Sequence, residues 1–233
     1  MGLPVMLLVV DAQKRLDALL VERGLASDLK EAIAIILSGA VLADEQRVDK
    51  PGSRLCTSSD IRLKTTGQKY ASRGGLKLEG ALRQLSISPR RKVCLDLGAS
   101  TGGFTDCLLR HGACKVYAFD VGRGQLHWKL QTDPRVVVRD STNARYLVPS
   151  MVEDPVDLIT IDVSFISLRL VLEPLRDFPS AEVIALVKPQ FEAERGEIGR
   201  GGVVKDPAVH ARVLARMIVW TIDSGLRLRG LVP

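Results

Sequence analysis

Residues 96–104 read DLGASTGGF and overlap the end of Val93–Leu97, an apolar segment with the pattern of a buried strand. Glycines at the end of a strand let a ligand approach the backbone closely, and ligands of doubly wound sheets bind at this end. Asp120 ends the next apolar segment, where a carboxylate can hold the two hydroxyl groups of a ribose. The pattern predicts a site for a nucleotide-like cofactor. The alternative is that these glycines only make a tight turn from strand to helix.

The glycine spacing argues against two common nucleotide sites. Ser100 stands where the dinucleotide motif G-x-G-x-x-G has its second glycine, and no Gly-Lys-Ser/Thr sequence follows, as a P-loop requires. A dehydrogenase is therefore disfavoured, and binding of NADH would test that alternative.

Positive charge is concentrated in one stretch of the chain. Residues 62–92 hold nine Lys/Arg and one Glu, a balance of +8, whereas residues 1–61 carry −2 and residues 93–233 are neutral. Such a segment is typical of a protein that binds a polyanion, although a solvated basic linker would have the same composition. The expected nucleic-acid contacts are Arg62, Lys64, Lys69, Arg73, Arg90, Arg91 and Lys92.

Several classes of protein are disfavoured by composition. No apolar run approaches the ~20 residues of a membrane span, and the N-terminus lacks the features of a secretory signal. The four cysteines form no close pair and the three histidines are scattered, so no metal site is expected. This use of cysteine favours a reducing, cytoplasmic location and no membrane partner.

Apolar spacing predicts two parts. Residues 16–20 and 32–37 have helical spacing and are followed by short β-like runs, which is typical of a small α+β module. From Lys92 onward strands alternate with helices, which indicates a Rossmann-like, doubly wound parallel α/β sheet. The predicted strands are 93–97, 115–120, 136–139, 158–162 and 183–188, and the predicted helices 103–111, 124–131, 166–176 and 207–223. The predicted domains are 11–66 and 79–233, joined by a basic linker, 67–78.

Several motifs resemble the haemolysin-A (TlyA) family of ribosomal RNA methyltransferases, and residues 96–104 resemble the cofactor loop of FtsJ-type 2′-O-ribose methyltransferases. The further matching motifs are SRGGLKL (72–78), DVG (120–122), TNAR (142–145), DVSFISL (162–168), LVKPQFE (186–192) and GGVV (201–204). The resemblance covers nearly the whole chain. It implies that the first module is an RNA-binding domain of ribosomal-protein type, that S-adenosylmethionine is the cofactor, and that ribosomal RNA or ribosomal subunits are the partner.

The resemblance also implies the site residues. Lys77, Asp162 and Lys188 match three members of a catalytic set of two lysines, an aspartate and a glutamate. The carboxylate would hold the lysines close together, and each lysine would lower the other's pKa until one accepts the proton of a ribose 2′-hydroxyl. The expected cofactor contacts are Asp96, Gly98, Ala99, Ser100, Thr101, Gly102, Gly103, Phe104, Asp120, Val121, Asp140 and Ser141.

Two departures from the family pattern leave an alternative open. The first module carries acidic residues at Asp28 and Asp44-Glu45, which weakens the expectation that it binds RNA strongly by itself. Family members continue through two more strands beyond the position of Pro233, and the fourth catalytic residue, a glutamate, belongs to that part. We therefore expect this chain as it stands to methylate RNA poorly or not at all. The alternative is a catalytically weak protein of the same fold that binds RNA and cofactor; a haemolysin is a minor one.

Overall fold

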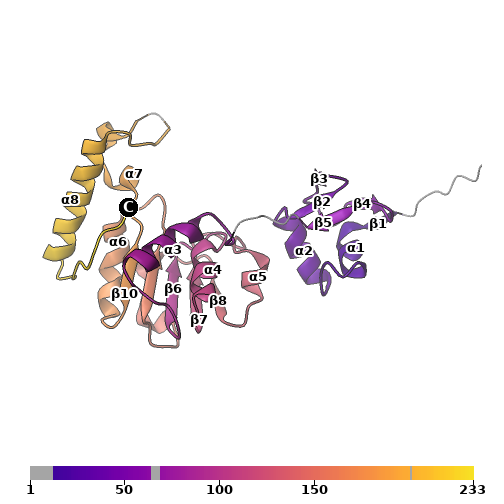
Figure 1. Ribbon diagram of the computed structural model, residues 1–233, viewed down its shortest axis with the longest axis horizontal. Helices are drawn as coiled ribbons and strands as arrows, with labels where there is room; N and C mark the ends of the chain where they lie inside the picture. The colour runs from indigo at the N-terminus through magenta and orange to yellow at the C-terminus, as the bar shows by residue number, and fades with distance from the viewer. Residues whose placement is uncertain (1–12, 64–68, 200) are drawn as a thin grey trace, which may run out of the picture. The chain divides into compact units, whose positions relative to one another are not determined.

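The computed structural model describes residues 13–63, 69–199 and 201–233, which belong to two compact units divided between Gly67 and Gln68 (Figure 1). The expected fold class, a doubly wound α/β domain preceded by a small α+β module, is confirmed. The stretch 67–78, expected to be a linker, falls mostly within the second unit, because Tyr70 and Leu78 are buried in that unit's core. Lys64 lies outside the described residues.

The N-terminal unit packs two helices with small antiparallel sheets. Its elements are β1 (Gln13–Arg15), α1 (Leu16–Glu22), α2 (Leu29–Leu37), β2 (Val41–Ala43), β3 (Gln46–Arg47), β4 (Arg54–Cys56) and β5 (Ile61–Leu63). Strand β2 lies between β3 and β5, and β1 pairs with β4. The apolar faces of both helices are buried, through residues such as Leu19 and Ile35. Asp28 caps α2 by accepting a hydrogen bond from the main-chain nitrogen of Glu31 at 2.7 Å.

The second unit contains a five-stranded, wholly parallel sheet in the order β10-β9-β6-β7-β8. The strands are β6 (Val93–Leu97), β7 (Lys115–Phe119), β8 (Val136–Arg139), β9 (Leu158–Ile161) and β10 (Glu182–Ala185). The chain runs from β6 through β7 to β8 in one direction and then returns to β9 on the other side of β6. This reversal separates the loops that follow β6 and β9, which is where doubly wound sheets form ligand crevices.

Helices cover both faces of this sheet (Figure 1). The helices are α3 (Gly74–Gln84), α4 (Gly103–Arg110), α5 (Trp128–Gln131), α6 (Leu168–Leu172), α7 (Pro189–Glu192) and α8 (Pro207–Asp223). Cys94 of β6 belongs to a core with α3, α4 and α5, whereas its neighbour Leu95 packs in a second core with α6 and α8. The alternation of side chains along β6 therefore places successive residues in different cores.

Two helices are shorter than the sequence predicts. The segment from Gly124 is not helical until Trp128, because Gly124 has a φ of 64°, outside the helical region. The helix expected to end at Arg176 becomes a 3₁₀ helix, Glu173–Asp177, where Pro174 has no amide hydrogen to donate to the α-helical pattern.

Candidate active site

A cavity of about 230 Å³ opens at the carboxyl end of the parallel strands. The start of α3, the loop after β6 and the ends of β9 and β10 all contribute to it. Its lining residues are Ser72, Gly74, Lys77, Gly98, Ala99, Ser100, Thr101, Gly103, Phe104, Asp162, Ser164 and Lys188. The structure therefore brings together Lys77, Asp162 and Lys188, which come from three separate segments of the chain.

Asp162 and Lys188 form an ion pair in the wall of this cavity. Lys188 Nζ lies 2.7 Å from Asp162 Oδ1, and the two side chains are only 18% and 23% exposed. The same nitrogen donates to Ser164 Oγ at 2.8 Å and to the main-chain oxygen of Asp162 at 3.4 Å. The pair lacks hydrogen-bond geometry, so Asp162 Oδ1, a buried atom, accepts no hydrogen bond from the described residues. Two oxygens of Asp162 and one of Ser164 thus contact Lys188 Nζ and fix its position.

The loop after β6 approaches its neighbours too closely for larger residues. A Cβ atom at Gly98, where φ is 85°, would lie 2.8 Å from the main-chain oxygen of Asp162, and one at Gly103 would lie 3.0 Å from the nitrogen of Gly75. Of the residues expected to contact a cofactor, Gly98, Ala99, Ser100, Thr101, Gly103 and Phe104 line the cavity. Gly102 does not; with a φ of 94° it precedes α4 and faces Leu130.

Asp96 is expected from the sequence to contact the cofactor, and the structure places its side chain elsewhere. It is fully buried and accepts hydrogen bonds from Thr105 Oγ1 at 2.6 Å and Thr160 Oγ1 at 3.2 Å. Burial raises the pKa of this carboxyl to about 6. Asp96 does not line the cavity, so it ties β6 to α4 and β9 beneath the loop.

Asp120 and its neighbours lie beside the loop, at the ends of β7 and β8. The Asp120 carboxylate accepts hydrogen bonds from the main-chain nitrogens of Ser100 and Gly122, each at 2.7 Å. Asp140 accepts from the main-chain nitrogen of Gly124 at 2.8 Å, and Val121 is 69% exposed. Ser141 is also exposed and has a φ of 55°. A carboxylate with remaining lone pairs thus lies next to an exposed apolar surface, outside the lining of the cavity.

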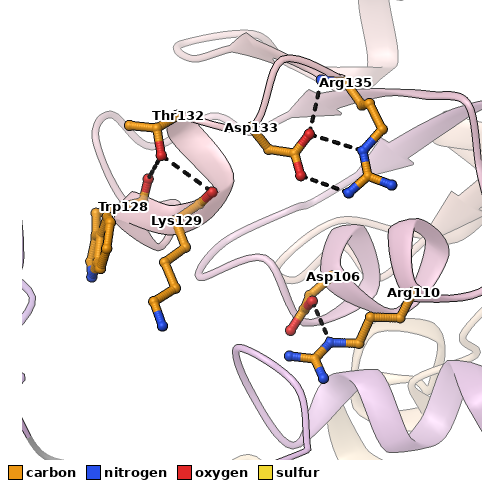
Figure 2. Close-up of polar contacts among 7 residues, drawn as sticks. All are labelled: Asp106, Arg110, Trp128, Lys129, Thr132, Asp133 and Arg135. Carbon is orange, nitrogen blue, oxygen red and sulfur yellow. Dashed lines mark hydrogen bonds and ion pairs between the residues drawn. The ribbon is translucent and has the colours of Figure 1, made fainter.

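The position of Lys77 depends on how the start of α3 packs against α4. A Cβ atom at Gly75 would overlap the side chain of Tyr70. Asp106 of α4 accepts a hydrogen bond from the main-chain nitrogen of Ala71 at 2.9 Å and pairs with Arg110 at 2.7 Å (Figure 2). These contacts hold the segment before α3 on the surface of α4, and Lys77 follows one turn later.

The expected RNA contacts lie in different parts of the two units. Arg90, Arg91 and Lys92 precede β6, at the opposite end of the sheet from the cavity. Arg62 pairs with Glu45, Lys69 with Glu79 and Lys92 with Glu182. Arg73, Arg90 and Arg91 are exposed and make no ion pair within the described parts of the chain.

Sequence reasoning assigned no role to three residues near the lysines. Ser72 and Ser164 line the cavity, and the ring of Phe165 is 92% exposed. Phe165 has a φ of 65°, unusual for a bulky residue, and its ring lies 5.3 Å from that of Phe191, tilted by 52°. All three lie within the family motifs SRGGLKL and DVSFISL, so these motifs could have identified them. The exposure and the φ angle of Phe165 could come only from the structure.

Among the described residues, no group of three His, Cys, Asp or Glu side chains could hold a metal ion. No helix in the described ranges is long and apolar enough to cross a membrane.

Comparisons with known proteins match both units. The FtsJ-like methyltransferase model matches residues 70–232 and the S4 domain model matches residues 14–61. The chain is 49% identical over 222 residues to YqxC of Bacillus subtilis, covering 94% of this chain and 79% of that protein. It is 47% identical over 201 residues to the 16S/23S rRNA (cytidine-2′-O)-methyltransferase TlyA of Mycobacterium tuberculosis, covering 85% and 75%. A solved protein from Streptococcus thermophilus, named as a hemolysin, superposes with a TM-score of 0.67 at 40% identity, covering 95% and 82%. The chain therefore belongs to the FtsJ-like methyltransferase family, as a member that resembles TlyA and YqxC and carries an N-terminal S4 domain.

Proposed function

We propose that this protein transfers a methyl group from S-adenosylmethionine to a ribose 2′-hydroxyl of ribosomal RNA. The observation that carries the proposal is the cavity in which a glycine-rich loop faces Lys77, Asp162 and Lys188. The name of the M. tuberculosis relative, a 16S/23S rRNA (cytidine-2′-O)-methyltransferase, supports the same substrate class. Ribosomal RNA as substrate would place the protein in the cytoplasm.

The residues present fit S-adenosylmethionine. Asp120 has acceptor lone pairs for the ribose hydroxyls, and exposed Val121 offers an apolar surface for adenine, with Asp140 and Ser141 beside it. Gly98 lines the cavity and, having no side chain, presents its backbone there, while the same lack of a Cβ atom lets the loop pack against the main-chain oxygen of Asp162. When bound, S-adenosylmethionine supplies an activated methyl group.

Lys77, Lys188 and Asp162 act on the ribose 2′-hydroxyl that receives the methyl group. A 2′-hydroxyl held in the cavity lies beside Lys77 and Lys188, and a lysine of this pair that is in its neutral form takes up the hydroxyl proton as the oxygen bonds to the methyl group. Asp162 and Ser164 hold Lys188 from one side, so this amine keeps a constant position. Much of the rate gain would then come from holding the oxygen in attack geometry.

The test is incorporation of labelled methyl into ribosomal RNA. Replacing Lys188 or Asp162 with Ala should lower kcat on the order of a hundredfold or more, because the acceptor loses its positioning groups. Asp120→Ala should instead weaken S-adenosylmethionine binding measured by calorimetry. If the unaltered chain binds cofactor and RNA but transfers no methyl, the alternative of a binding protein with the same fold is correct.

A further inference from the structure

We propose that Glu192 is a positioning residue that locks the two loops carrying Lys188 and Asp162 against each other; this inference rests on the proposed function. Glu192 is the last residue of α7, the single helical turn that begins directly after Lys188. Its Oε1 atom accepts a hydrogen bond from the main-chain nitrogen of Leu168 at 2.6 Å, and its Oε2 atom accepts from Ser167 Oγ at 2.8 Å.

These two bonds replace a local cap of α6. Ser167 is the residue before α6, yet its side chain makes no hydrogen bond to the first turn of that helix. The carboxylate of Glu192 satisfies both the hydroxyl and the first free amide of the helix from 25 residues farther along the chain. Charge-assisted bonds of this kind are roughly twice as strong as neutral ones. The start of α6 is therefore held by the segment after β10.

The segment that follows β9 and the segment that follows β10 contact each other at both of their ends. At the strand ends, Lys188 contacts Asp162 and Ser164; at the helical ends, Glu192 contacts Ser167 and Leu168. The loop between Asp162 and Ser167 is thus held at both ends by one partner segment.

Phe165 lies between these two points of attachment. Its backbone has a φ of 65°, and a non-glycine residue keeps this conformation only where its surroundings determine it. Its ring contacts that of Phe191, the neighbour of Glu192. The main-chain oxygen of Glu192 also accepts from Arg216 of α8 at 3.4 Å, which connects α7 to a long helix.

Glu192 acts through these loops and not on the reacting atoms. Both carboxylate oxygens are used at α6, and the side chain does not line the cavity. Loss of the carboxylate should free the start of α6. The loop between Asp162 and Ser167, which carries Phe165, should then become more mobile, and the ion pair between Lys188 and Asp162 should weaken. Cofactor binding depends on the loops after β6 and β7, so it should remain.

The first experiment compares Glu192→Ala, Glu192→Gln and Glu194→Ala. Glu192→Ala should lower kcat on the order of tenfold to a hundredfold through mispositioning, with an unchanged Kd for S-adenosylmethionine. Glu192→Gln keeps an acceptor for the amide of Leu168 and should restore most of kcat. Glu194→Ala is the control for loss of a neighbouring carboxylate, because that exposed glutamate pairs with Arg216, which also contacts the main-chain oxygen of Glu192, but makes neither of the two bonds to α6. The proposal fails if Glu192→Ala keeps its kcat, if cofactor affinity falls in parallel, or if Glu192→Gln is as inactive as Glu192→Ala.

A second measurement does not require methyl transfer. The acylation rate of Lys188, followed by mass spectrometry with Lys129 as internal reference, should rise several-fold in Glu192→Ala and stay unchanged in Glu192→Gln. The amine freed from Asp162 is then accessible to reagent. An unchanged rate overturns the inference, whereas absence of methyl transfer by the unaltered protein refutes only the proposed function. If Glu192→Ala does not fold, Ser167→Ala removes one of the two bonds and should raise the rate in the same direction; no rise there also overturns the inference.

Discussion

At the level of single residues, burial separates two aspartates that both follow apolar strand residues. Asp120 accepts hydrogen bonds from the backbone at the end of β7, next to the loop after β6. Asp96 is fully buried, with two threonine hydroxyls as partners. A buried carboxylate is costly in its charged form, which is why the pKa of Asp96 is raised to about 6.

The raised pKa of Asp96 predicts a dependence of stability on pH. The carboxyl loses its proton near pH 3.8 in the unfolded chain and near pH 6 in the folded one. Between these values the folded state binds more protons, so the free energy of unfolding falls as pH rises through this window. Asp96→Asn should therefore raise the free energy of unfolding at pH 7 by on the order of 1–3 kcal/mol, and the gain should vanish near pH 4.

Urea unfolding at several pH values measures this gain. Asp133→Asn is the control of opposite sign, since Arg135 lowers the pKa of that carboxyl and the neutral variant should lose stability at pH 7 (Figure 2). Asp96→Asn should also keep its affinity for S-adenosylmethionine. A large loss of that affinity would make Asp96 a cofactor contact after all.

Phe165 presents an exposed ring directly after the cavity residue Ser164. Bases taken out of an RNA strand stack on such aromatic side chains, with contributions of about 1–3 kcal/mol per base. Phe165→Ala should therefore raise KM for RNA or lower kcat by about tenfold while cofactor affinity is kept. Phe165→Trp should stay active, and Tyr146→Ala, which removes another exposed aromatic, is the control. Equal effects of Phe165→Ala and Tyr146→Ala would contradict a stacking role.

At the level of elements, close packing of α3 against α4 carries Lys77 to the cavity. Gly75 and Gly103 allow this approach, because side chains there would meet Tyr70, Ser72 or the opposing backbone. Gly80, on the same helix, has no atom within 4 Å of an added Cβ. Within α3, Gly75 is therefore closely packed, whereas Gly80 is not.

Alanine substitutions at these two glycines should have opposite effects. Gly80→Ala should stabilise the protein by about 0.5–1 kcal/mol, since alanine favours the helix and meets nothing. Gly75→Ala should destabilise it by about 1–3 kcal/mol through overpacking against Tyr70, and should lower kcat because Lys77 moves. Thermal unfolding and methyl transfer provide the two measurements. Equal behaviour of the two variants would show that the α3–α4 contact does not position Lys77.

At the level of the whole molecule, the basic stretch 62–92 is divided by the fold. Arg62 belongs to the N-terminal unit, Arg73 lies at the start of α3, and Arg90 and Arg91 precede β6. Because the cavity lies at the carboxyl end of the strands, Arg90 and Arg91 can contact only RNA that lies away from the acceptor ribose. We expect them to contribute to affinity and not to chemistry.

Reversing both arginines should therefore separate binding from turnover. Arg90→Glu with Arg91→Glu should weaken RNA affinity about tenfold or more at low salt and reduce the slope of log affinity against log salt by about two. The value of kcat at saturating RNA should be unchanged. Lys30→Glu with Lys50→Glu is the matched control, two exposed cations of the N-terminal unit without ion pairs among the described residues. Equal losses in the two double variants would mean that Arg90 and Arg91 are not a preferred contact.

The sequence by itself determined the features that depend on local order. Apolar segments located all five parallel strands, with ends within three residues of those in the structure, because side-chain periodicity and glycine stops are local signals. The sequence also predicts helix α8 at Pro207–Asp223, and the structure shows Asp206 capping its start and Pro207 as its first residue. The family motifs alone were enough to select Lys77, Asp162 and Lys188 as one set.

Only the tertiary structure decided which of these residues share a surface. The side chain of Asp96 is buried because helices cover both faces of the sheet, and the linear pattern of acid and glycine contains no such information. Glu192 caps helix α6 through Ser167, which lies 25 residues earlier in the chain. Gly74 lines the cavity at the carboxyl end of the strands, whereas Arg90 lies at the opposite end of the sheet. Contacts between distant segments arise from strand order and packing, and spacing along the chain does not encode them.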